Sequence, residues 1–126
     1  MLCTLPLSHI FGLVTLGYAT KTITPITVLP QFSVEAVVKL ITQTEFSYWP
    51  CVPTMLDVVL LHPLITSGEL HLGERIKAIT VGGAPLYPRL SRKIRDLSLN
   101  VYDGWGMTET CSRGIAPPIM GRKKTG

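Results

Sequence analysis

The chain has 126 residues, which is enough for one small domain with a single core. Hydrophobic residues make up 46% of it and the mean hydropathy is +0.34, both high for so small a globule. Such values are expected if many strands are central strands of a larger sheet, so we predict that the chain is a part of a larger protein. The net charge of +4 comes from basic residues dispersed away from the aromatic residues. This pattern favours a solvated helix face and an exposed tail over nucleic-acid binding.

The three cysteines argue against two common kinds of site. Cys3, Cys51 and Cys111 are odd in number and widely spaced and contain no CxxC pair, so neither a disulfide framework nor a zinc site is indicated. The default is a reducing intracellular compartment, and the sequence leaves open whether it is cytoplasmic or peroxisomal. His62 and His71 have no partner at metal-like spacing and are predicted to be ordinary surface or loop residues.

Residues 1–18 are apolar enough to suggest a signal peptide or a membrane anchor. They lack a basic start, and no convincing small-residue cleavage site follows them. Pro6, Ser8 and His9 interrupt the apolar run, which favours a buried strand followed by a helix. We therefore predict no transmembrane segment.

Strands and helices are predicted to alternate along the chain, as in a wound α/β fold. A short buried strand is expected at 2–5, and Ser8 is expected to cap a helix that runs to about Gly17. A strand rich in β-branched residues should follow at 22–29. Ser33 then caps an amphipathic helix. The apolar positions of that helix are Val34, Val37, Val38 and Ile41.

The middle of the chain continues this alternation. A strand is expected at 46–50, and Pro53 suits the first position of a helix that Pro63 stops. A surface loop is expected at 66–73, and a central strand at 76–81. The buried stripe of the helix is predicted to consist of Met55, Leu56, Val59 and Leu60.

The last predicted helix opens at Pro88, and the last strand covers 99–102. The inward residues of this helix are expected to be Leu90, Ile94 and Leu97. The residues expected to face water are Arg89, Arg92, Lys93 and Arg95. From Ile115 onward, little regular structure is expected.

Two glycine-containing loops, 82–85 and 103–106, are expected to leave the carboxyl ends of strands. Open α/β sheets bind ligands in the crevice beyond such ends, so the loops could form opposite walls of one nucleotide site. Thr108 and Glu109 follow the second loop, and they offer a hydroxyl for a phosphate and a carboxylate for Mg²⁺. The alternative for each loop is an ordinary glycine-rich turn.

Three segments resemble motifs of the AMP-forming acyl-CoA synthetase superfamily, and they occur in the family's order. The sequence at 102–110 is similar to the adenylate-binding motif, usually Gly-Tyr-Gly-Met-Thr-Glu. The sequence at 5–13 is similar to the motif in which a histidine lies near the acyl group and the pantetheine tunnel. The sequence at 81–86 is similar to the loop beside the acyl pocket and the adenine.

The resemblance implies an α/β fold in which 1–126 form a middle portion of the large AMP-binding N-terminal domain. The family's phosphate loop with its lysine and the small C-terminal domain are absent, and 121–126 resemble the start of the loop that leads toward that domain. The implied reaction joins a carboxylic acid to CoA through an acyl-adenylate formed from ATP. Because key parts are missing, we expect this fragment to be inactive alone.

The resemblance also implies roles for individual residues. Glu109 would bind Mg²⁺, and Thr108 would donate to the α-phosphate. Trp105 would lie against the adenine, where relatives usually have tyrosine, and Asp103 stands where relatives often have another polar residue. The other residues of the implied nucleotide site are Gly83, Ala84, Gly104, Gly106 and Met107. The implied acyl pocket consists of His9, Phe11, Thr15 and Gly82, with His9 also counted as catalytic.

Several alternatives stay open at this point. His9 could simply be a residue at the start of a helix. The chain could belong to a luciferase-like or carrier-protein-loading branch, or be a non-catalytic remnant that binds nucleotide or a partner. The segment 6–9 has no carboxylate, which argues against an amino acid and for a fatty, aryl or other simple acid. Which acid, which thiol acceptor and which oligomeric state apply are not determined by the sequence.

Overall fold

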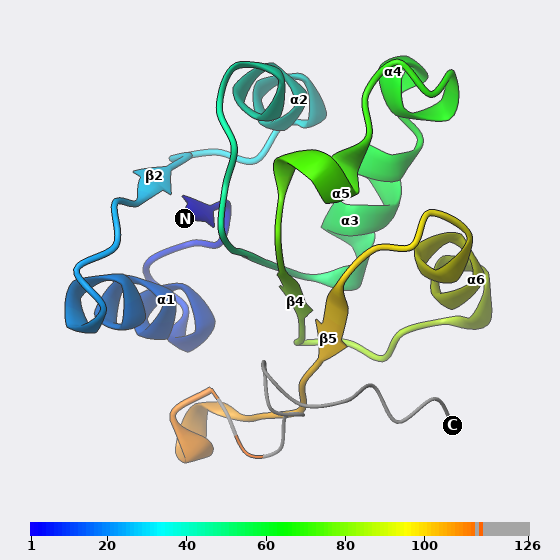
Figure 1. Cartoon of the computed structure of the whole chain (residues 1–126). Helices are drawn as coiled ribbons and strands as arrows, with labels where there is room; N and C mark the ends of the chain where they lie inside the picture. The colour runs from blue at the N-terminus through cyan, green and yellow to red at the C-terminus, as the bar shows by residue number, and fades with distance from the viewer. Residues whose placement is uncertain (113, 115–126) are drawn as a thin grey trace.

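The computed structural model describes residues 1–112 and 114, and it shows an α/β fold with parallel strands (Figure 1). Two predictions, the irregular segment from Ile115 and the loop resemblance at 121–126, lie outside the described residues. In chain order the elements are β1 (Leu2–Cys3), α1 (Ile10–Lys21), β2 (Thr27–Val28), α2 (Val34–Gln43), β3 (Trp49–Cys51), α3 (Pro53–Leu60), α4 (Pro63–Thr66), α5 (Leu72–Arg75), β4 (Ile79–Val81), α6 (Pro88–Asp96), β5 (Val101–Asp103) and the 3₁₀-helix η1 (Thr108–Thr110).

The larger sheet has the order β3-β4-β5, so the strand predicted to be central is central. Ile79 pairs with Trp49 on one side and with Val101 on the other, both in parallel register. β1 and β2 form a second parallel pair, and the Leu2 N–H donates to the Tyr48 carbonyl just before β3. The three strands of the larger sheet therefore end at one edge, where the glycine loops begin.

The helices α2 and α3 cover the sheet as their sequence patterns predict. Ser33 caps α2, and its Oγ accepts from the Ala36 N–H at 3.0 Å. Val37, Val38 and Ile41 are buried. In α3, Pro53 is the first residue, and the helix buries Leu56, Val59 and Leu60. Met55, which was predicted to lie in the same buried stripe, is only half-buried against the core. These side chains join the fully buried strand residues Trp49, Ile79 and Val81 in one core.

The first helix differs from its prediction at both ends. His9, not Ser8, is the N-cap, because the His9 Nδ1 accepts from the Phe11 N–H. The helix continues past Gly17 to Lys21, whose charge suits a helix C-terminus. Among the described residues, no helix has the length and apolar character that crossing a membrane requires.

The strands are shorter than predicted. In the predicted strand 22–29, only Thr27 and Val28 pair, because the chain first leaves α1 and passes through Ile23 at a φ of 51°. In 46–50, Phe46 makes only an isolated bridge to Ile76, and β3 begins at Trp49. The other strands shift by similar amounts: β1 ends at Cys3, β4 begins at Ile79, and β5 covers Val101–Asp103.

Three further predictions need correction. The predicted surface loop at 66–73 contains the end of α4 and the start of α5, and it buries Leu70 and Leu72 against the core. Pro63 was predicted to stop the preceding helix, yet α3 already ends at Leu60 and Pro63 begins the new short helix α4. Leu97 was predicted to face inward, yet it is 45% exposed because α6 ends at Asp96, whereas Leu90 is buried as predicted.

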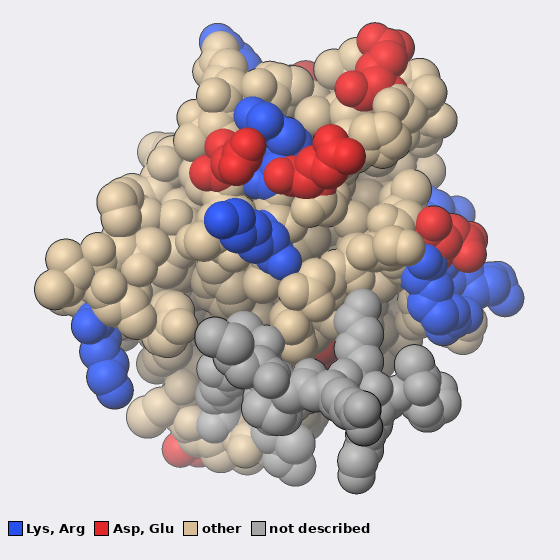
Figure 2. Space-filling view, in the orientation of Figure 1, with Lys and Arg blue, Asp and Glu red and all other residues tan. Residues whose placement is uncertain are grey.

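His62 and His71 are ordinary residues at helix starts. His62 occupies the N-cap of α4, where its Nδ1 accepts from the Leu64 N–H, and His71 occupies the N-cap position of α5. In the face shown in Figure 2, Lys and Arg side chains gather where α6 lies in Figure 1, and others stand among acidic side chains. Arg75 and Glu45 form an ion pair with a distance of 3.6 Å between Nη1 and Oε1.

Candidate functional site

A cavity of about 260 Å³ lies where β4 and β5 end and α1 begins. Pockets for drug-sized ligands typically measure roughly 300–1,000 Å³, so this one holds a small ligand or part of a larger one. Its lining consists of His9, Ile10, Phe11, Val14, Thr15, Tyr18, Tyr48, Thr80, Val81, Gly82, Gly83, Gly104, Trp105, Gly106, Met107, Thr108 and Ser112. Most of the residues that the sequence indicated therefore lie around one space.

The two glycine loops lie side by side because the backbone hydrogen bonds between the strands continue into the first residues of each loop. The Gly82 N–H donates to the Cys51 carbonyl at 3.2 Å, and the Gly104 N–H donates to the Val81 carbonyl at 2.9 Å. A Cβ added to Gly82 would lie 3.2 Å from the Gly104 carbonyl oxygen and 3.4 Å from the Phe11 ring. Glycine therefore suits position 82, since a side chain there would press on both walls of the cavity.

The start of α1 forms the opposite side of the cavity. His9 is both the N-cap of the helix and a lining residue, so the interpretation as a helix-start residue and the one as a site residue are compatible. Because Nδ1 accepts from the Phe11 N–H, the neutral imidazole carries its proton on Nε2. Thr15 is buried, and its hydroxyl donates to the Phe11 carbonyl at 2.8 Å.

The loop after β5 brings an aromatic ring to the cavity. Trp105 lines the cavity and is 57% exposed. The Gly114 N–H donates to the Trp105 carbonyl, and a Cβ on Gly114 would meet the indole at 2.8 Å. Beyond it, Met107 and Thr110 close η1, with the Met107 N–H donating to the Thr110 hydroxyl at 3.0 Å. The loop is therefore held by local hydrogen bonds.

Three of the predicted site residues, Ala84, Asp103 and Glu109, do not line the cavity. Partial burial raises the pKa of the Asp103 carboxyl, against the opposing effect of a hydrogen bond from the Gly104 backbone. Glu109 is exposed in η1, directly after the lining residue Thr108. Within the part of the chain that the structure describes, no cluster of three or more His, Cys, Asp or Glu side chains could hold a metal. A single carboxylate nevertheless fits Mg²⁺, which is commonly bound by one or two carboxylates together with substrate phosphates.

Among the lining residues that sequence reasoning missed are Tyr18, Tyr48 and Thr80. Tyr18 was recoverable, because it lies seven residues after Phe11 and therefore on the same face of α1. Tyr48 and Thr80 come from two neighbouring strand segments, and no local pattern marks them. The Tyr18 and Tyr48 rings are tilted, with centroids 6.0 Å apart, and form an aromatic wall.

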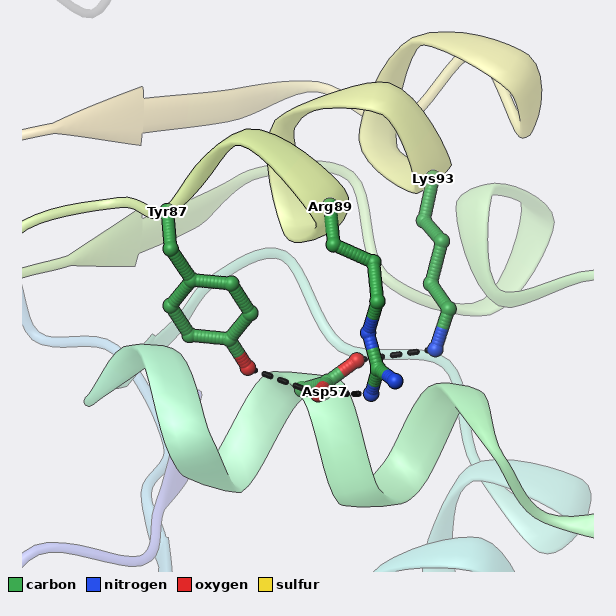
Figure 3. A network of polar contacts seen from close by, with 4 residues as sticks. All are labelled: Asp57, Tyr87, Arg89 and Lys93. Atoms are coloured by element: carbon green, nitrogen blue, oxygen red, sulfur yellow. Dashed lines mark hydrogen bonds and ion pairs between the residues drawn. The ribbon is translucent and has the colours of Figure 1, made fainter.

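A second polar cluster joins α3 to α6 and was also missed (Figure 3). Asp57 is 7% exposed. Its Oδ2 accepts from the Tyr87 hydroxyl at 2.6 Å and from Arg89 at 2.8 Å, and its Oδ1 accepts from Lys93 at 2.8 Å. Arg89 and Lys93 therefore do not simply face water, as predicted, but bind a buried carboxylate. Asp57 is the one charged residue between Glu45 and Glu69, a signal that could have indicated a buried partner.

The environment of Asp57 keeps this residue ionised. Burial alone raises the pKa of the Asp57 carboxyl, but hydrogen bonds from Lys93, Tyr87 and Arg89 outweigh it and lower the pKa from 3.8 to about 2. In turn, the hydrogen bond to Asp57 raises the pKa of the Tyr87 phenol. None of these four side chains lines the cavity, so the Asp57 cluster is separate from the candidate site.

Comparisons with known proteins agree with the motifs. The chain is 30% identical over 120 residues to 4-coumarate–CoA ligase-like 4 of Oryza sativa subsp. japonica, a match that covers 91% of this chain and 20% of the relative. The fold is similar to O-succinylbenzoate coenzyme A synthetase (MenE) from Bacillus subtilis in complex with ATP and magnesium ion, with a TM-score of 0.79 and 32% identity. That match covers 92% of this chain and 23% of the synthetase.

The N-terminal domain of FACL13 from Mycobacterium tuberculosis is also similar, with a TM-score of 0.80 and 25% identity over 91% of this chain and 29% of that one. The chain thus spans about a fifth of the curated relative and a quarter of the synthetase. A family model described as AMP-binding enzyme matches residues 1–126. The chain belongs to the family of AMP-binding, adenylate-forming enzymes.

Proposed function

We infer that the chain is the part of an AMP-forming acid–CoA ligase that holds the adenylate and the acyl group. The observation that carries this inference is the meeting of three separate segments at one cavity: the start of α1, the loop after β4 and the loop after β5. These are the three segments whose sequences resemble the family's motifs. Similar proteins are named as CoA ligases, and one is described with ATP and magnesium ion, which supports the same substrates here.

The loop after β5 is assigned to the nucleotide. Gly104 and Gly106 let the backbone approach AMP closely, and Trp105 offers a ring for the adenine. Thr108 would donate its hydroxyl to the α-phosphate, where charge develops during the reaction. Glu109 would hold Mg²⁺, which when bound neutralises phosphate charge. Gly83 and Ala84 in the loop after β4 would border the adenine and the acyl group.

The start of α1 is assigned to the acid. His9, Phe11 and Thr15 line the cavity together with Gly82, whose missing side chain keeps the space open. Among the described lining residues there is no Asp or Glu that could pair with an ammonium group. This composition supports a simple carboxylic acid as substrate rather than an amino acid. CoA would approach on the His9 side and accept the acyl group.

The described part of the site lacks the charge that adenylation requires. Both reactants, the carboxylate and ATP, are anions, and their approach must be neutralised. No Lys or Arg is among the described residues that line the cavity. We therefore propose that this chain, as a middle portion of the AMP-binding domain, binds ligands without turning them over. The same observation favours a second candidate function, a nucleotide-binding module without catalysis.

Binding and catalysis can be tested separately. AMP should quench the fluorescence of Trp105, and Trp105→Phe should abolish the change, whereas Trp49 is fully buried and should not respond. The purified chain should then be mixed with ATP, Mg²⁺, CoA and a panel of carboxylic acids, with no pyrophosphate release expected. Release that depends on acid and CoA would refute the proposed incompetence. A failure of AMP and ATP to bind in calorimetry would overturn the assignment of the cavity.

A further inference from the structure

A second hollow in the surface lies at the other end of the larger sheet. It measures about 460 Å³ and lies between the end of α4, α5 and the turn that follows α6. α5 and this turn come directly before β4 and β5, whereas the candidate site follows those strands (Figure 1). Among the residues that the structure describes, the two hollows share no lining residue. We call the second one the α4–α6 groove, and the proposed function does not use it.

The floor of the groove is apolar. Ile65, Leu70 and Leu72 line it and are buried members of the core. Leu97, which is 45% exposed at the end of α6, adds an apolar wall. A volume of about 460 Å³ lies within the roughly 300–1,000 Å³ typical of small-molecule sites, which are mostly apolar with a few polar groups. The groove therefore suits a small ligand with an apolar body.

The polar groups of the groove offer hydrogen-bond acceptors. Glu74 in α5 is exposed, and it is the one Asp or Glu among the described lining residues. The Thr66 hydroxyl already donates to the Pro63 carbonyl at 3.1 Å. The Ser67 hydroxyl donates to Oε1 of Glu69 at 2.9 Å. A hydroxyl that has donated its proton keeps only lone pairs for a further partner, so a ligand that brings donors fits these groups.

Charge decides which kind of donor fits best. No Lys or Arg is among the described lining residues. Arg75, the next residue after Glu74, is already engaged, because it pairs with Glu45 and donates to the Ile41 carbonyl. His71, the other titratable lining residue, can accept a hydrogen bond when it is neutral. An ammonium group brings three donors and a positive charge, and charge-assisted hydrogen bonds are roughly twice as strong as neutral ones. The groove is therefore complementary to a cation.

We propose that the α4–α6 groove binds an organic ammonium ion with a compact apolar body, such as an arylalkylamine. Glu74 is the charge partner of the ammonium group, and Leu97 is the apolar wall beside the body of the ligand. This site goes beyond the proposed function and does not depend on it. The two sites lie at opposite ends of the sheet, and they are assigned to ligands of opposite charge.

The test uses three probes that share a phenylethyl body and differ in charge: phenethylammonium, phenethyl alcohol and hydrocinnamate. Binding to the purified, isotope-labelled chain is followed by NMR. The amide signals of Gly68 and Gly73 report on the groove, and those of Gly82 and Gly104 report on the candidate site. Each titration is repeated with saturating AMP, so that the two sites are observed independently.

Two variants and one control separate charge from shape. Glu74→Gln keeps the size of the side chain and removes its charge. Leu97→Ala shortens the apolar wall. Glu35→Gln is the matched control, because Glu35 is an exposed acid of α2 that does not line the groove. Glu74 is exposed, so the melting temperature of Glu74→Gln should stay close to that of the unaltered chain.

Phenethylammonium should bind roughly tenfold more tightly than the alcohol, the low end for a hydrogen bond to a charged group, because Glu74 is exposed. Hydrocinnamate should leave the groove signals unshifted. Glu74→Gln should reduce the preference to less than about twofold. Leu97→Ala should weaken the ammonium and the alcohol alike, by roughly threefold, because both lose the same apolar contact. Neither Glu35→Gln nor AMP should change these affinities.

Four results would overturn the inference. Unshifted signals of Gly68 and Gly73 would show that the groove binds no organic cation. Equal affinities for the ammonium and the alcohol would show that the groove does not recognise charge. A preference that persists in Glu74→Gln assigns the cation to another carboxylate. Shifts confined to Gly82 and Gly104 place it in the candidate site. A failure of AMP to bind counts against the proposed function alone.

Discussion

The cavity and the Asp57 cluster are built in opposite ways. The cavity is shaped by backbone: glycines at strand ends, a helix cap and continued ladder hydrogen bonds, with no Lys, Arg, Asp or Glu among the described residues that line it. The Asp57 cluster is shaped by charge, since one buried carboxylate binds two cations of α6 and the phenol of Tyr87, the N-cap of that helix. We therefore expect substitutions in the Asp57 cluster to lower mainly the free energy of unfolding, and substitutions in the cavity to lower mainly the affinity for ligands.

The largest effect is expected from Asp57→Ala. The change leaves Lys93 and Arg89 without their carboxylate, although the side chains of these two residues stay 27% and 59% exposed and can be hydrated. We expect a loss of about 2–3 kcal/mol in the free energy of unfolding, somewhat less than the roughly 3–5 kcal/mol for a fully buried pair, because both cations can be hydrated. Urea unfolding measures this loss. The control is Asp96→Ala, because Asp96 is exposed, and its free energy of unfolding should stay within about 0.5 kcal/mol of that of the unaltered chain. An equally small effect at Asp57 would remove the contrast between the two regions.

Acid should reveal the same cluster without any mutation. The pKa of Asp57 is lowered from 3.8 to about 2 in the folded chain, so the folded state binds its proton less readily than the unfolded state. The resulting stabilisation of about 2 kcal/mol is complete well above pH 4 and is lost as the pH falls from about 4 to about 2. Unfolding curves across this range should show the loss, and Asp57→Asn should lack this component. A pH dependence unchanged by Asp57→Asn would mean that other groups cause it.

Gly82→Ala should act mainly on the cavity. Its Cβ would press on the Gly104 carbonyl oxygen and the Phe11 ring, and the overpacking should cost about 1–2 kcal/mol of stability. We also expect at least tenfold weaker binding of AMP or an acyl-adenylate analogue, because the two loops must separate. Gly17→Ala is the matched control, since open space surrounds that position of α1. Binding equal in the two variants would show that the contact between the loops does not shape the site.

The smallest effect on stability is expected at His9, which both caps α1 and lines the cavity. His9→Ala removes the N-cap of α1 and should cost about 1 kcal/mol, whereas His9→Asn keeps a capping side chain and should keep stability. If His9 also contacts the acyl group, both variants should weaken an acyl-adenylate analogue while leaving AMP affinity unchanged. Thermal unfolding and calorimetry separate the two roles. Full ligand affinity in His9→Asn would leave only the capping role.

The sequence predicted local structure best where one signal dominated. Ser33 and Pro53 marked the starts of α2 and α3, and the apolar spacing after each gave the buried faces. It placed the start of α1 wrongly because Ser8 and His9 both offer a capping atom, and only the turn geometry chooses His9. A strand was predicted at 22–29, but only Thr27 and Val28 form one, because β-branched residues indicate an extended chain without specifying a pairing partner.

By itself, the sequence determined the family, the central strand and most of the cavity, because motifs of contiguous residues at strand ends carry their own backbone requirements. Only the tertiary structure decided which distant residues meet. Tyr48 and Thr80 line one cavity although they are far apart in the sequence, and Asp57 of α3 binds Arg89 and Lys93 of α6. The physical reason is that hydrogen bonds and ion pairs between side chains depend on distances set by packing, which no local pattern in the chain encodes.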